Sequence, residues 1–311
     1  MILVVGLSPA WQRTLVFERF VPGKVNRAIR VTATASGKGV NVARVASILG
    51  ADVKLLTVTG GARGRWLLAS LRRQGMPVHA VTVEGETRIC QTLLSDGPTT
   101  ELVEECAPLR PVELQEVLRV FRTEVPRAEM VVLTGTVPKG CGDDFYARLI
   151  VEARRHDVPV LIDAQKAQLL NALKKRPLLV KINRDELAAA TQLNCTQRSG
   201  LSRALHRLLK DGPRHAVITD GAKSVFVSET PGRTITRLNP PRVKAQNPIG
   251  SGDAMMAGIA VGLLRGVSMT EAARFGIACG AANAMTAEPG FLRLADVKRL
   301  CSTAGPVVSI V

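Results

Sequence analysis

The segment Asn247-Pro248-Ile249-Gly250-Ser251-Gly252-Asp253 carries the strongest signal in this chain, and the apolar run AMMAGIAVGLL at 254–264 follows it directly. The run predicts a buried helix, so the Gly-Ser-Gly turn would direct free backbone N–H groups and the positive end of the helix dipole at one point. Such a turn suits the charge of a phosphoryl group, and Asp253 adds a carboxylate where a substrate hydroxyl would lose its proton. The pattern indicates phosphoryl transfer to an alcohol.

The same residues are also compatible with ordinary turn and capping chemistry. Aspartate caps helices and glycine accepts positive φ, so Gly250, Ser251, Gly252 and Asp253 alone do not separate a helix cap from a catalytic site. The rest of the chain has to decide between the two readings.

Size and composition limit the class of protein. The 311 residues are 46% hydrophobic, which is enough for one large α/β domain or two smaller ones. The N-terminal run MILVVG is too short for a membrane span and predicts a first buried strand, and we expect no signal peptide. The six cysteines stand singly without metal-ligand spacing, which favours reduced thiols in a cytosolic protein.

The formal net charge of +16 raises the question of a nucleic-acid partner. Aromatic residues make up only 3% of the chain, so stacking platforms for single strands are scarce. The densest basic runs, Lys174-Lys175-Arg176 and Arg72-Arg73, are short and typical of a solvated helix surface. We therefore expect neither a nucleic-acid nor a membrane partner, since a basic protein can equally bind phosphate-bearing small molecules.

Short apolar runs alternate with longer helical patterns along most of the chain. Continuous apolar strands separated by helices favour an α/β fold with a mostly parallel sheet covered on both faces. The predicted strands are 4–5, 53–58, 130–133, 158–162, 178–182 and 215–219. The predicted helices are 38–50, 64–75, 111–125, 143–156, 184–193, 199–211, 251–265, 269–286 and 294–302.

Two stretches break this rhythm. Residues 12–35 and 87–106 alternate polar and apolar side chains and contain Pro-Gly and Asp-Gly-Pro turns. Such alternation predicts antiparallel strands with one solvated face. We expect them to form a small sheet that stands off the main domain and covers a cleft as a lid.

A second glycine-rich segment, Ala35-Ser36-Gly37-Lys38-Gly39-Val40-Asn41, lies near the N-terminus. Gly37 and Gly39 let the backbone approach a ligand closely, while Lys38 and Asn41 offer a cation and an amide at the start of the following helix. Taken alone, the segment could equally be a plain loop. It lacks the Gly-Lys-Ser/Thr ending of a P-loop.

Together, the segments 36–43 and 250–253 resemble the signatures of the ribokinase or PfkB family of carbohydrate kinases, most of all the 1-phosphofructokinase and tagatose-6-phosphate kinase subgroup. The resemblance covers nearly the whole chain, and implies a ribokinase-like three-layer sandwich with a β-lid, residues 1–311 forming a single kinase domain. Further segments in family order are Leu7-Ser8-Pro9-Ala10, Gly23-Lys24-Val25-Asn26-Arg27, Thr87-Arg88, Thr99-Thr100-Glu101, Thr134-Gly135-Thr136-Val137-Pro138, Lys181-Ile182-Asn183-Arg184-Asp185-Glu186 and Thr219-Asp220-Gly221-Ala222.

The resemblance also implies roles for individual residues. Asp253 would be the general base, and the anion hole would be formed by Gly250, Ser251 and Gly252. The phosphate already on the substrate would contact Lys38, Arg27 and Arg88, and the sugar hydroxyls would contact Gly37, Asn41 and the residue at position 12, Gln12. ATP would be bound by Lys181, Asn183, Glu186, Thr219, Gly221, Asn283 and residues 250–252. Asn183 and Glu186 would organise Mg²⁺ through waters, and the same pair also matches a helix capping box.

Four positions depart from the family pattern. Gln12 stands where the subgroup usually has Asp, Ser8 replaces Asn, Ser36 replaces Gly, and Val103 precedes Glu104 where Asn-Glu is usual. A carboxylate accepts two hydroxyl hydrogen bonds strongly, whereas an amide is neutral and offers one acceptor. The identity of the sugar therefore stays open.

The sequence predicts a cytoplasmic ATP- and Mg²⁺-dependent sugar-phosphate kinase that converts fructose 1-phosphate to fructose 1,6-bisphosphate. The alternatives are a kinase of tagatose 6-phosphate, a kinase of an unphosphorylated sugar or nucleoside, and a member that has lost activity and binds sugar phosphate as a sensor. Gln12 favours the sensor, and the intact segment 250–253 opposes it.

The lid strands predict a homodimer. Apolar residues recur at period-2 spacing, and a small isolated antiparallel sheet is marginally stable, so a partner sheet or the closed cleft should cover it. The residues expected on this apolar face are Leu15, Phe17, Val25, Ile29 and Val31, with Leu93 opposite.

Overall fold

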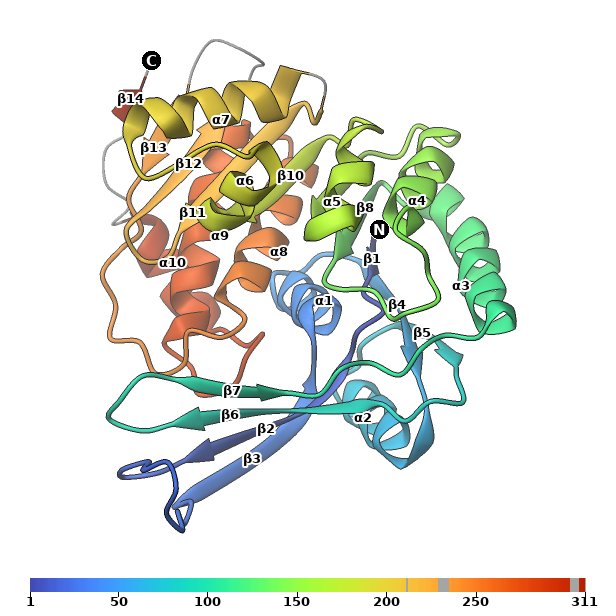
Figure 1. Ribbon diagram of the computed structural model, residues 1–311, viewed down its shortest axis with the longest axis vertical. Helices are drawn as coiled ribbons and strands as arrows, with labels where there is room; N and C mark the ends of the chain where they lie inside the picture. The colour runs from blue at the N-terminus through green and yellow to red at the C-terminus, as the bar shows by residue number, and fades with distance from the viewer. Residues whose placement is uncertain (211, 229–234, 303–307, 311) are drawn as a thin grey trace.

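The computed structural model describes residues 1–210, 212–228, 235–302 and 308–310. Its main element is a ten-stranded sheet in the order β14-β13-β12-β11-β10-β9-β8-β1-β4-β5 (Figure 1). Strands from β11 to β5 in this order run parallel, whereas β12, β13 and β14 add antiparallel to one edge. The strands are β1 (Ile2–Val5), β4 (Val53–Thr59), β5 (Val78–Thr82), β8 (Met130–Thr134), β9 (Val160–Asp163), β10 (Leu179–Asn183), β11 (His215–Asp220), β12 (Ser224–Ser228), β13 (Ile235–Leu238) and β14 (Val308–Ile310).

Helices cover both faces of this sheet, so the predicted three-layer α/β arrangement is confirmed. Successive side chains of a strand point to opposite faces, and β1 shows the result: Leu3 and Val5 belong to one apolar core, Ile2 and Val4 to the other. The first core is completed by α3 (Pro111–Glu124), the 3₁₀ turn η1 (Val125–Arg127), α4 (Phe145–Arg154), α5 (Lys166–Leu173), α6 (Arg184–Thr191) and α7 (Arg198–Lys210). The second is completed by α1 (Lys38–Ile48), α2 (Gly61–Arg73), α8 (Ser251–Leu264), α9 (Met269–Ala284) and α10 (Leu294–Ser302).

Glycines let α8 and α9 pack at very short range. A Cβ added at Gly258 would lie 2.7 Å from the Cα of Gly276, which is closer than real side chains allow. Because α8 is apolar along almost its whole length, this contact buries the helix and fixes where its N-terminus ends. That N-terminus carries the glycine turn singled out in the sequence.

The small sheet extends from the body of the molecule, below the main sheet in Figure 1. Its strands are β2 (Ala10–Val16), β3 (Arg30–Ser36), β6 (Arg88–Leu94) and β7 (Thr100–Val103), in the order β3-β2-β6-β7. The hairpins β2–β3 and β6–β7 are antiparallel as predicted, and the central pair β2–β6 that joins them runs parallel. The register aligns Gln12 with Thr34 on one side and Cys90 on the other.

Of the six apolar residues expected on one face of the small sheet, Leu15 is half-buried and the other five divide into two groups. Phe17 and Leu93 are buried within the chain, each 7% exposed. Val25, Ile29 and Val31 are exposed to 83%, 64% and 48%. The outer part of the predicted face is therefore open to solvent in a single chain.

Most predicted elements occur in the structure with ends shifted by a few residues. Residue 211, the last of the predicted helix 199–211, lies outside the described residues. The sequence reading missed β5, β12, β13, β14 and α5. All of them are short. The helix α5 has only eight residues and begins at Lys166, which has a φ of 55°, soon after β9 ends at Asp163. Such a short segment shows too little helical periodicity to be recognised in the sequence.

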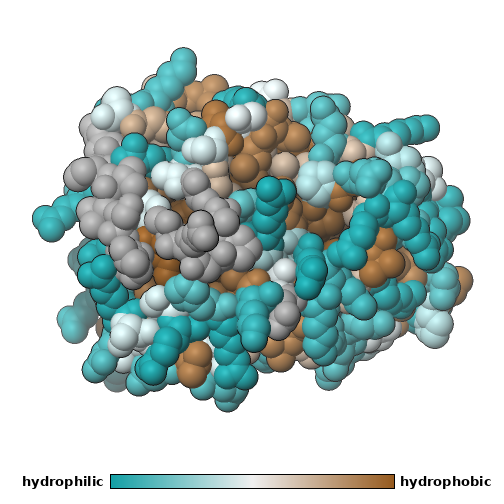
Figure 2. Space-filling model, turned by 90° about the horizontal axis from the view of Figure 1, so that it is seen from above, coloured by the Kyte–Doolittle hydropathy of each residue, from teal (hydrophilic) through white to brown (hydrophobic). Residues whose placement is uncertain are grey.

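Figure 2 shows the end of the molecule opposite the small sheet, where hydrophilic side chains surround separate hydrophobic patches. In the described part of the chain, no helix is long and apolar enough to span a membrane. All six cysteines are free thiols.

Candidate active site

A cleft of about 660 Å³ lies between the small sheet and the carboxyl ends of the parallel strands. In an open α/β sheet this edge is where ligands bind, because loops and helix N-termini converge there. Most residues proposed from the sequence line it: Gln12, Gly37, Lys38, Asn41, Arg88, Lys181, Asn183, Glu186, Thr219, Gly250, Gly252 and Asp253.

The glycine turn forms the N-terminus of α8 as predicted. Gly250 precedes the helix with φ 81°, and a Cβ there would lie 2.9 Å from the backbone nitrogen of Gly290. Helix geometry leaves N–H groups of the first turn without intrahelical acceptors. Lys181 lies close by, since a Cβ at Gly252 would be 3.3 Å from its Nζ. The turn thus combines backbone donors, the helix dipole and a cation, which suits an anion.

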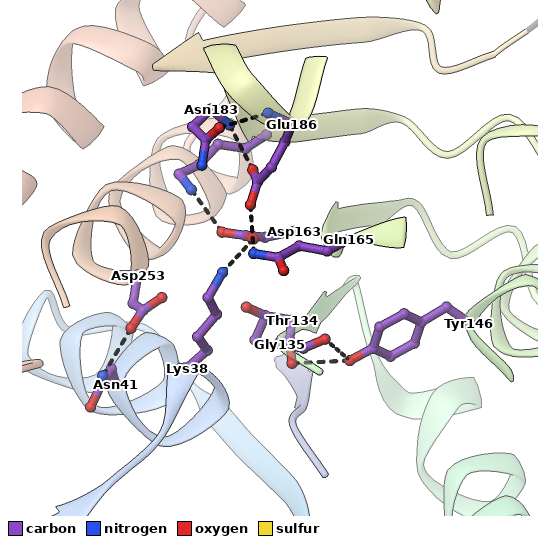
Figure 3. Close-up of polar contacts among 11 residues, drawn as sticks. Lys38, Asn41, Thr134, Gly135, Tyr146, Asp163, Gln165, Asn183, Glu186 and Asp253 are labelled. Carbon is purple, nitrogen blue, oxygen red and sulfur yellow. Dashed lines mark hydrogen bonds and ion pairs between the residues drawn. The ribbon is translucent and has the colours of Figure 1, made fainter. Parts of the chain in front are cut away.

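Asp253 lies in the first turn of α8 and is only 6% exposed. Asn41 Nδ2 donates to its Oδ2 at 2.8 Å, from the facing helix α1 (Figure 3). Ser36 Oγ donates to Asn41 Oδ1 at 2.9 Å, which holds the amide with its NH₂ group toward Asp253. The serine that departs from the family pattern at position 36 therefore supports the carboxylate indirectly.

The surroundings of Asp253 raise its pKa to about 6. Burial is the main cause, because a desolvated carboxylate is disfavoured relative to the neutral acid. Lys38 pulls the pKa down, the charge of Asp163 pushes it up, and the hydrogen bond from Asn41 lowers it again. A carboxyl group with this pKa is largely ionised at neutral pH yet basic enough to accept a proton.

Asp163, at the end of β9, forms ion pairs with two lysines at the centre of the cleft. Its Oδ1 is 2.8 Å from Lys38 Nζ and its Oδ2 is 2.7 Å from Lys181 Nζ. Burial alone would raise the pKa of Asp163, but the two ammonium groups hold it well below its usual range. Burial alone would lower the pKa of Lys38, and Asp163 together with Asp253 raises it instead. Asp163 and Lys38 are therefore charged at neutral pH.

Asn183 and Glu186 form the capping box that the sequence predicted. The Asn183 side chain accepts from the Glu186 N–H, and Glu186 Oε2 accepts from the Asn183 N–H, each at 2.8 Å. Glu186 Oε1 also accepts from Gln165 Nε2 at 2.6 Å (Figure 3). Among the described residues, no group of three or more His, Cys, Asp or Glu side chains could hold a metal. Any Mg²⁺ here would therefore take most of its ligands from phosphates and water.

Arg88 and Gln12 line the cleft from the small sheet. The Arg88 guanidinium donates to the backbone oxygens of Glu104 and Ser8, each at 3.1 Å, and in the described chain its buried Nε has no partner. Gln12 Nε2 donates to Thr92 Oγ1 at 2.9 Å. Nε2 also donates to the Arg13 carbonyl at 3.2 Å, so both N–H donors of the Gln12 amide are used and the acceptor oxygen is what the side chain can offer a ligand.

The sequence model for pfkB family carbohydrate kinases matches residues 1–291. The chain belongs to this family. It is a carbohydrate kinase with the fold that the glycine turn and the parallel strands predicted.

Solved structures share the fold over almost the whole chain. Phosphofructokinase-2 from Escherichia coli, in complex with fructose 6-phosphate, has a TM-score of 0.87 at 24% identity, covering 97% of this chain and 98% of that one. A protein from Thermotoga maritima described as a possible 1-phosphofructokinase has a TM-score of 0.89 at 22% identity, covering 99% of each chain. Ribokinase from Arabidopsis thaliana, complexed with ribose and ATP, has a TM-score of 0.76 at 20% identity, covering 96% and 98%.

Four residues assigned from the family resemblance do not line the cleft. Arg27 is exposed in the loop between β2 and β3, and Gly221 lies in the turn after β11 with φ 54°. Ser251 lies between two cleft-lining residues, Gly250 and Gly252, but does not line the cleft itself. Its Oγ accepts from Asn283 Nδ2 at 3.3 Å.

Asn283, which the resemblance predicted to contact ATP, does not reach the surface of the cleft. Asn283 is fully buried on α9, so its side chain is closed to a ligand. Its Nδ2 donates to the Ile249 carbonyl at 2.9 Å, and its Oδ1 accepts from the Gly290 N–H at 2.8 Å. These two hydrogen bonds stabilise the glycine turn on the side away from the cleft.

Sequence reasoning missed two residues that line this cleft and one that supports its wall. Asp163 and Gln165 follow the strand predicted to end at 162, and a polar residue at the carboxyl end of a buried parallel strand is a signal that could have identified Asp163. Tyr146 donates from its hydroxyl to the carbonyls of Thr134 and Gly135, each at 3.0 Å, and so supports one wall of the cleft. Nothing in the sequence pattern pointed to that tyrosine.

Replacing the buried carboxyl should stabilise the kinase at alkaline pH. Because the folded-state pKa of Asp253 is raised, its contribution to stability is full below the unfolded pKa near 4 and is lost as pH rises through about 6. Moving a pKa from 3.8 to about 6 corresponds to roughly 3 kcal/mol. Urea unfolding should therefore find Asp253→Asn more stable than the wild type by up to roughly 3 kcal/mol at pH 8, with the difference shrinking toward pH 4. A difference that is absent at pH 8 would contradict the raised pKa.

Proposed function

We propose that this pfkB family kinase transfers the γ-phosphoryl group of ATP to fructose 1-phosphate, forming fructose 1,6-bisphosphate. The observation that carries the proposal is the position of Asp253, a buried carboxylate of raised pKa beside an anion-binding helix N-terminus. Arg88 lines the same cleft and supplies a guanidinium that a second phosphate could pair with. We further propose that the whole chain acts as one kinase domain, since the main sheet takes strands from both its beginning and its end.

In the proposed reaction the acceptor hydroxyl of the sugar attacks the γ-phosphorus and the bond to the ADP oxygen breaks. Asp253 accepts the hydroxyl proton as the new P–O bond forms. The N–H groups of the α8 turn and the Lys181 ammonium offset the charge that develops on the transferred group. Asn41 keeps the Asp253 carboxylate oriented throughout, so its contribution is positional.

The nucleotide would bind at the carboxyl ends of β10 and β11. Thr219 and Lys181 line this part of the cleft, and Glu186 and Asn183 are fixed by their mutual capping bonds. Mg²⁺, when bound, would neutralise phosphate oxygens and be reached by Glu186 and Asn183 through waters. Gln165 orients Glu186 for this contact.

One observation favours an unphosphorylated acceptor as a second candidate. Glu101 and Glu105 also line the cleft. Burial raises the pKa of Glu101, although the nearby Arg88 pulls it down. Negative charge on this wall would oppose a phosphate and would suit the hydroxyls of a plain sugar.

An acceptor panel tests the proposed reaction. ATP turnover should be fastest with fructose 1-phosphate when it is compared with fructose 6-phosphate, tagatose 6-phosphate, fructose and a nucleoside. Asp253→Asn should lower kcat with the best acceptor by at least about 10²-fold while ATP binding is kept. In the wild type kcat should rise with pH to a plateau above the pKa of about 6, because the base acts in its ionised form.

The panel also separates the alternatives. Preference for fructose itself would transfer the proposal to an unphosphorylated sugar. Binding of sugar phosphate without turnover of any acceptor would identify a sensor. Near-normal kcat in Asp253→Asn would remove that residue from the mechanism.

Replacing Arg88 should weaken the binding of the sugar-phosphate acceptor but not the binding of ATP. If its guanidinium holds the substrate phosphate, Arg88→Ala should raise KM for the sugar phosphate by about 10–150-fold, since one charge-assisted hydrogen bond contributes roughly 1.5–3 kcal/mol. KM for ATP should change little. Arg13→Ala is a matched control, because Arg13 lies on the same sheet but on the face opposite Gln12. Equal effects on both substrates would overturn the assignment.

Restoring the usual carboxylate tests the departure at position 12. Gln12 is 4% exposed and lines the cleft, so Gln12→Asp would place a two-oxygen acceptor near the sugar hydroxyls. We expect tighter binding of a ketohexose phosphate, measured by calorimetry. Weaker binding of every ketohexose phosphate would show that this chain uses another acceptor.

We also propose that the kinase forms a homodimer through the small sheet. The face of the sheet turned away from the cleft and the loop between β2 and β3 expose apolar residues that an isolated chain leaves in water: Val25, Ile29, Val31 and Leu102. Light scattering should give the mass of a dimer, and the double variant Ile29→Asp/Val31→Asp should give that of a monomer. Val112→Asp, an exposed valine on α3, should leave the dimer intact. A wild-type monomer would dispose of this proposal.

A further inference from the structure

A second hollow, of about 490 Å³, lies on the outside of the molecule where α3, α4 and α5 meet. It shares no lining residue with the kinase cleft. Five of its lining residues are basic and two are acidic. The basic ones are Arg122, Arg148, Arg155, Lys174 and Lys175, and the acidic ones are Asp144 and Glu152.

The cations reach this hollow from three separate helices. Arg148 lies on α4 and Arg155 is the C-cap residue of that helix, seven residues further along, so they lie on one face together with Val151 and Glu152. Arg122 comes from the last turn of α3. Lys174 and Lys175 follow the end of α5. Charges that converge from several elements surround a small volume, whereas a stripe along one helix would suit an extended polymer.

Most of the positive charge here is not neutralised within the chain. Glu152 is paired with Arg155 at 2.8 Å. Among the described residues, Arg122, Arg148 and Lys175 have no carboxylate within ion-pair distance. The floor between them includes Ala147 and Val151.

Two other surface hollows among the described residues lack this excess of cations. The hollow between α5 and α6 has Lys166 as its one basic lining residue, together with Asp185 and Glu186. The hollow beside the β8–α4 loop has Lys139 and Lys166 with Asp143. The overall positive charge of the protein alone therefore does not account for the excess of cations between α3, α4 and α5.

We propose that this hollow binds a compact anion carrying two or more phosphoryl groups. Its volume is that of a small-molecule site, and its guanidinium and ammonium groups are the side chains that bind phosphate oxygens. The apolar floor leaves room for a non-ionic part of the ligand between the phosphates.

Calorimetric titration with inorganic tripolyphosphate at constant ionic strength tests the site. The wild type should show saturable binding, and Arg148→Gln/Lys175→Gln should weaken it by at least about tenfold, since two partly solvated charge contacts are lost. The control Arg203→Gln/Arg207→Gln removes the same charge from exposed residues of α7 and should leave the affinity nearly unchanged. Hydrogen exchange should show protection by tripolyphosphate at 144–155 and 171–175.

Each other outcome would overturn the proposal. Equal weakening in both double variants would mean that only net charge matters. Unchanged binding in Arg148→Gln/Lys175→Gln, or protection confined to 248–253, would place the anion in the kinase cleft. Equally tight binding of inorganic monophosphate would show that several phosphoryl groups are not required. A single-stranded RNA oligonucleotide that binds more tightly, and loses this binding in the same variant, would identify a polymer site.

Discussion

The buried ion pairs between Asp163 and two lysines hold the centre of the cleft together. Lys38 begins α1, Lys181 lies in β10, and Asp163 ends β9, so one carboxylate ties together three elements that meet at the carboxyl edge of the sheet. Removing a charge from such a group would leave its partners buried and uncompensated, which commonly costs about 3–5 kcal/mol. The arrangement also places two cations where phosphoryl oxygens would lie while keeping the resting charge low.

The same ion pairs influence the pKa of Asp253, the proposed general base. Two lysines alone would draw its pKa down toward that of an ordinary surface carboxylate, and Asp163 opposes them. Burial then keeps the pKa raised, while Ser36 and Asn41 fix the direction of the carboxylate. The electrostatics and the positioning of this carboxylate therefore come from different parts of the chain.

The sequence was sufficient for the layers, the glycine turn and the helix that follows it, because these depend on local periodicity and on the φ that only glycine adopts easily. It was not sufficient for neighbours across the fold. Alternation predicts which residues of a strand share a face, but not that β2 would pair in parallel with β6. Asp163 stands alone after a strand, so its two lysine partners became visible only when the strands were placed. For Asn283, the family resemblance implied a contact with ATP, whereas its hydrogen bonds in the structure go to the back of the glycine turn.

The proposed base Asp253 is buried, and its surroundings place its pKa between that of a free carboxyl and neutrality. A ¹³C NMR titration of the aspartate carboxyl carbons in the folded protein, with Asp253→Asn used to assign the resonance, measures this directly. The account predicts a midpoint near pH 6 in the wild type and a lower midpoint in Asp163→Asn, where the opposing negative charge is gone. A wild-type midpoint near 4, the ordinary value for aspartate, would contradict it.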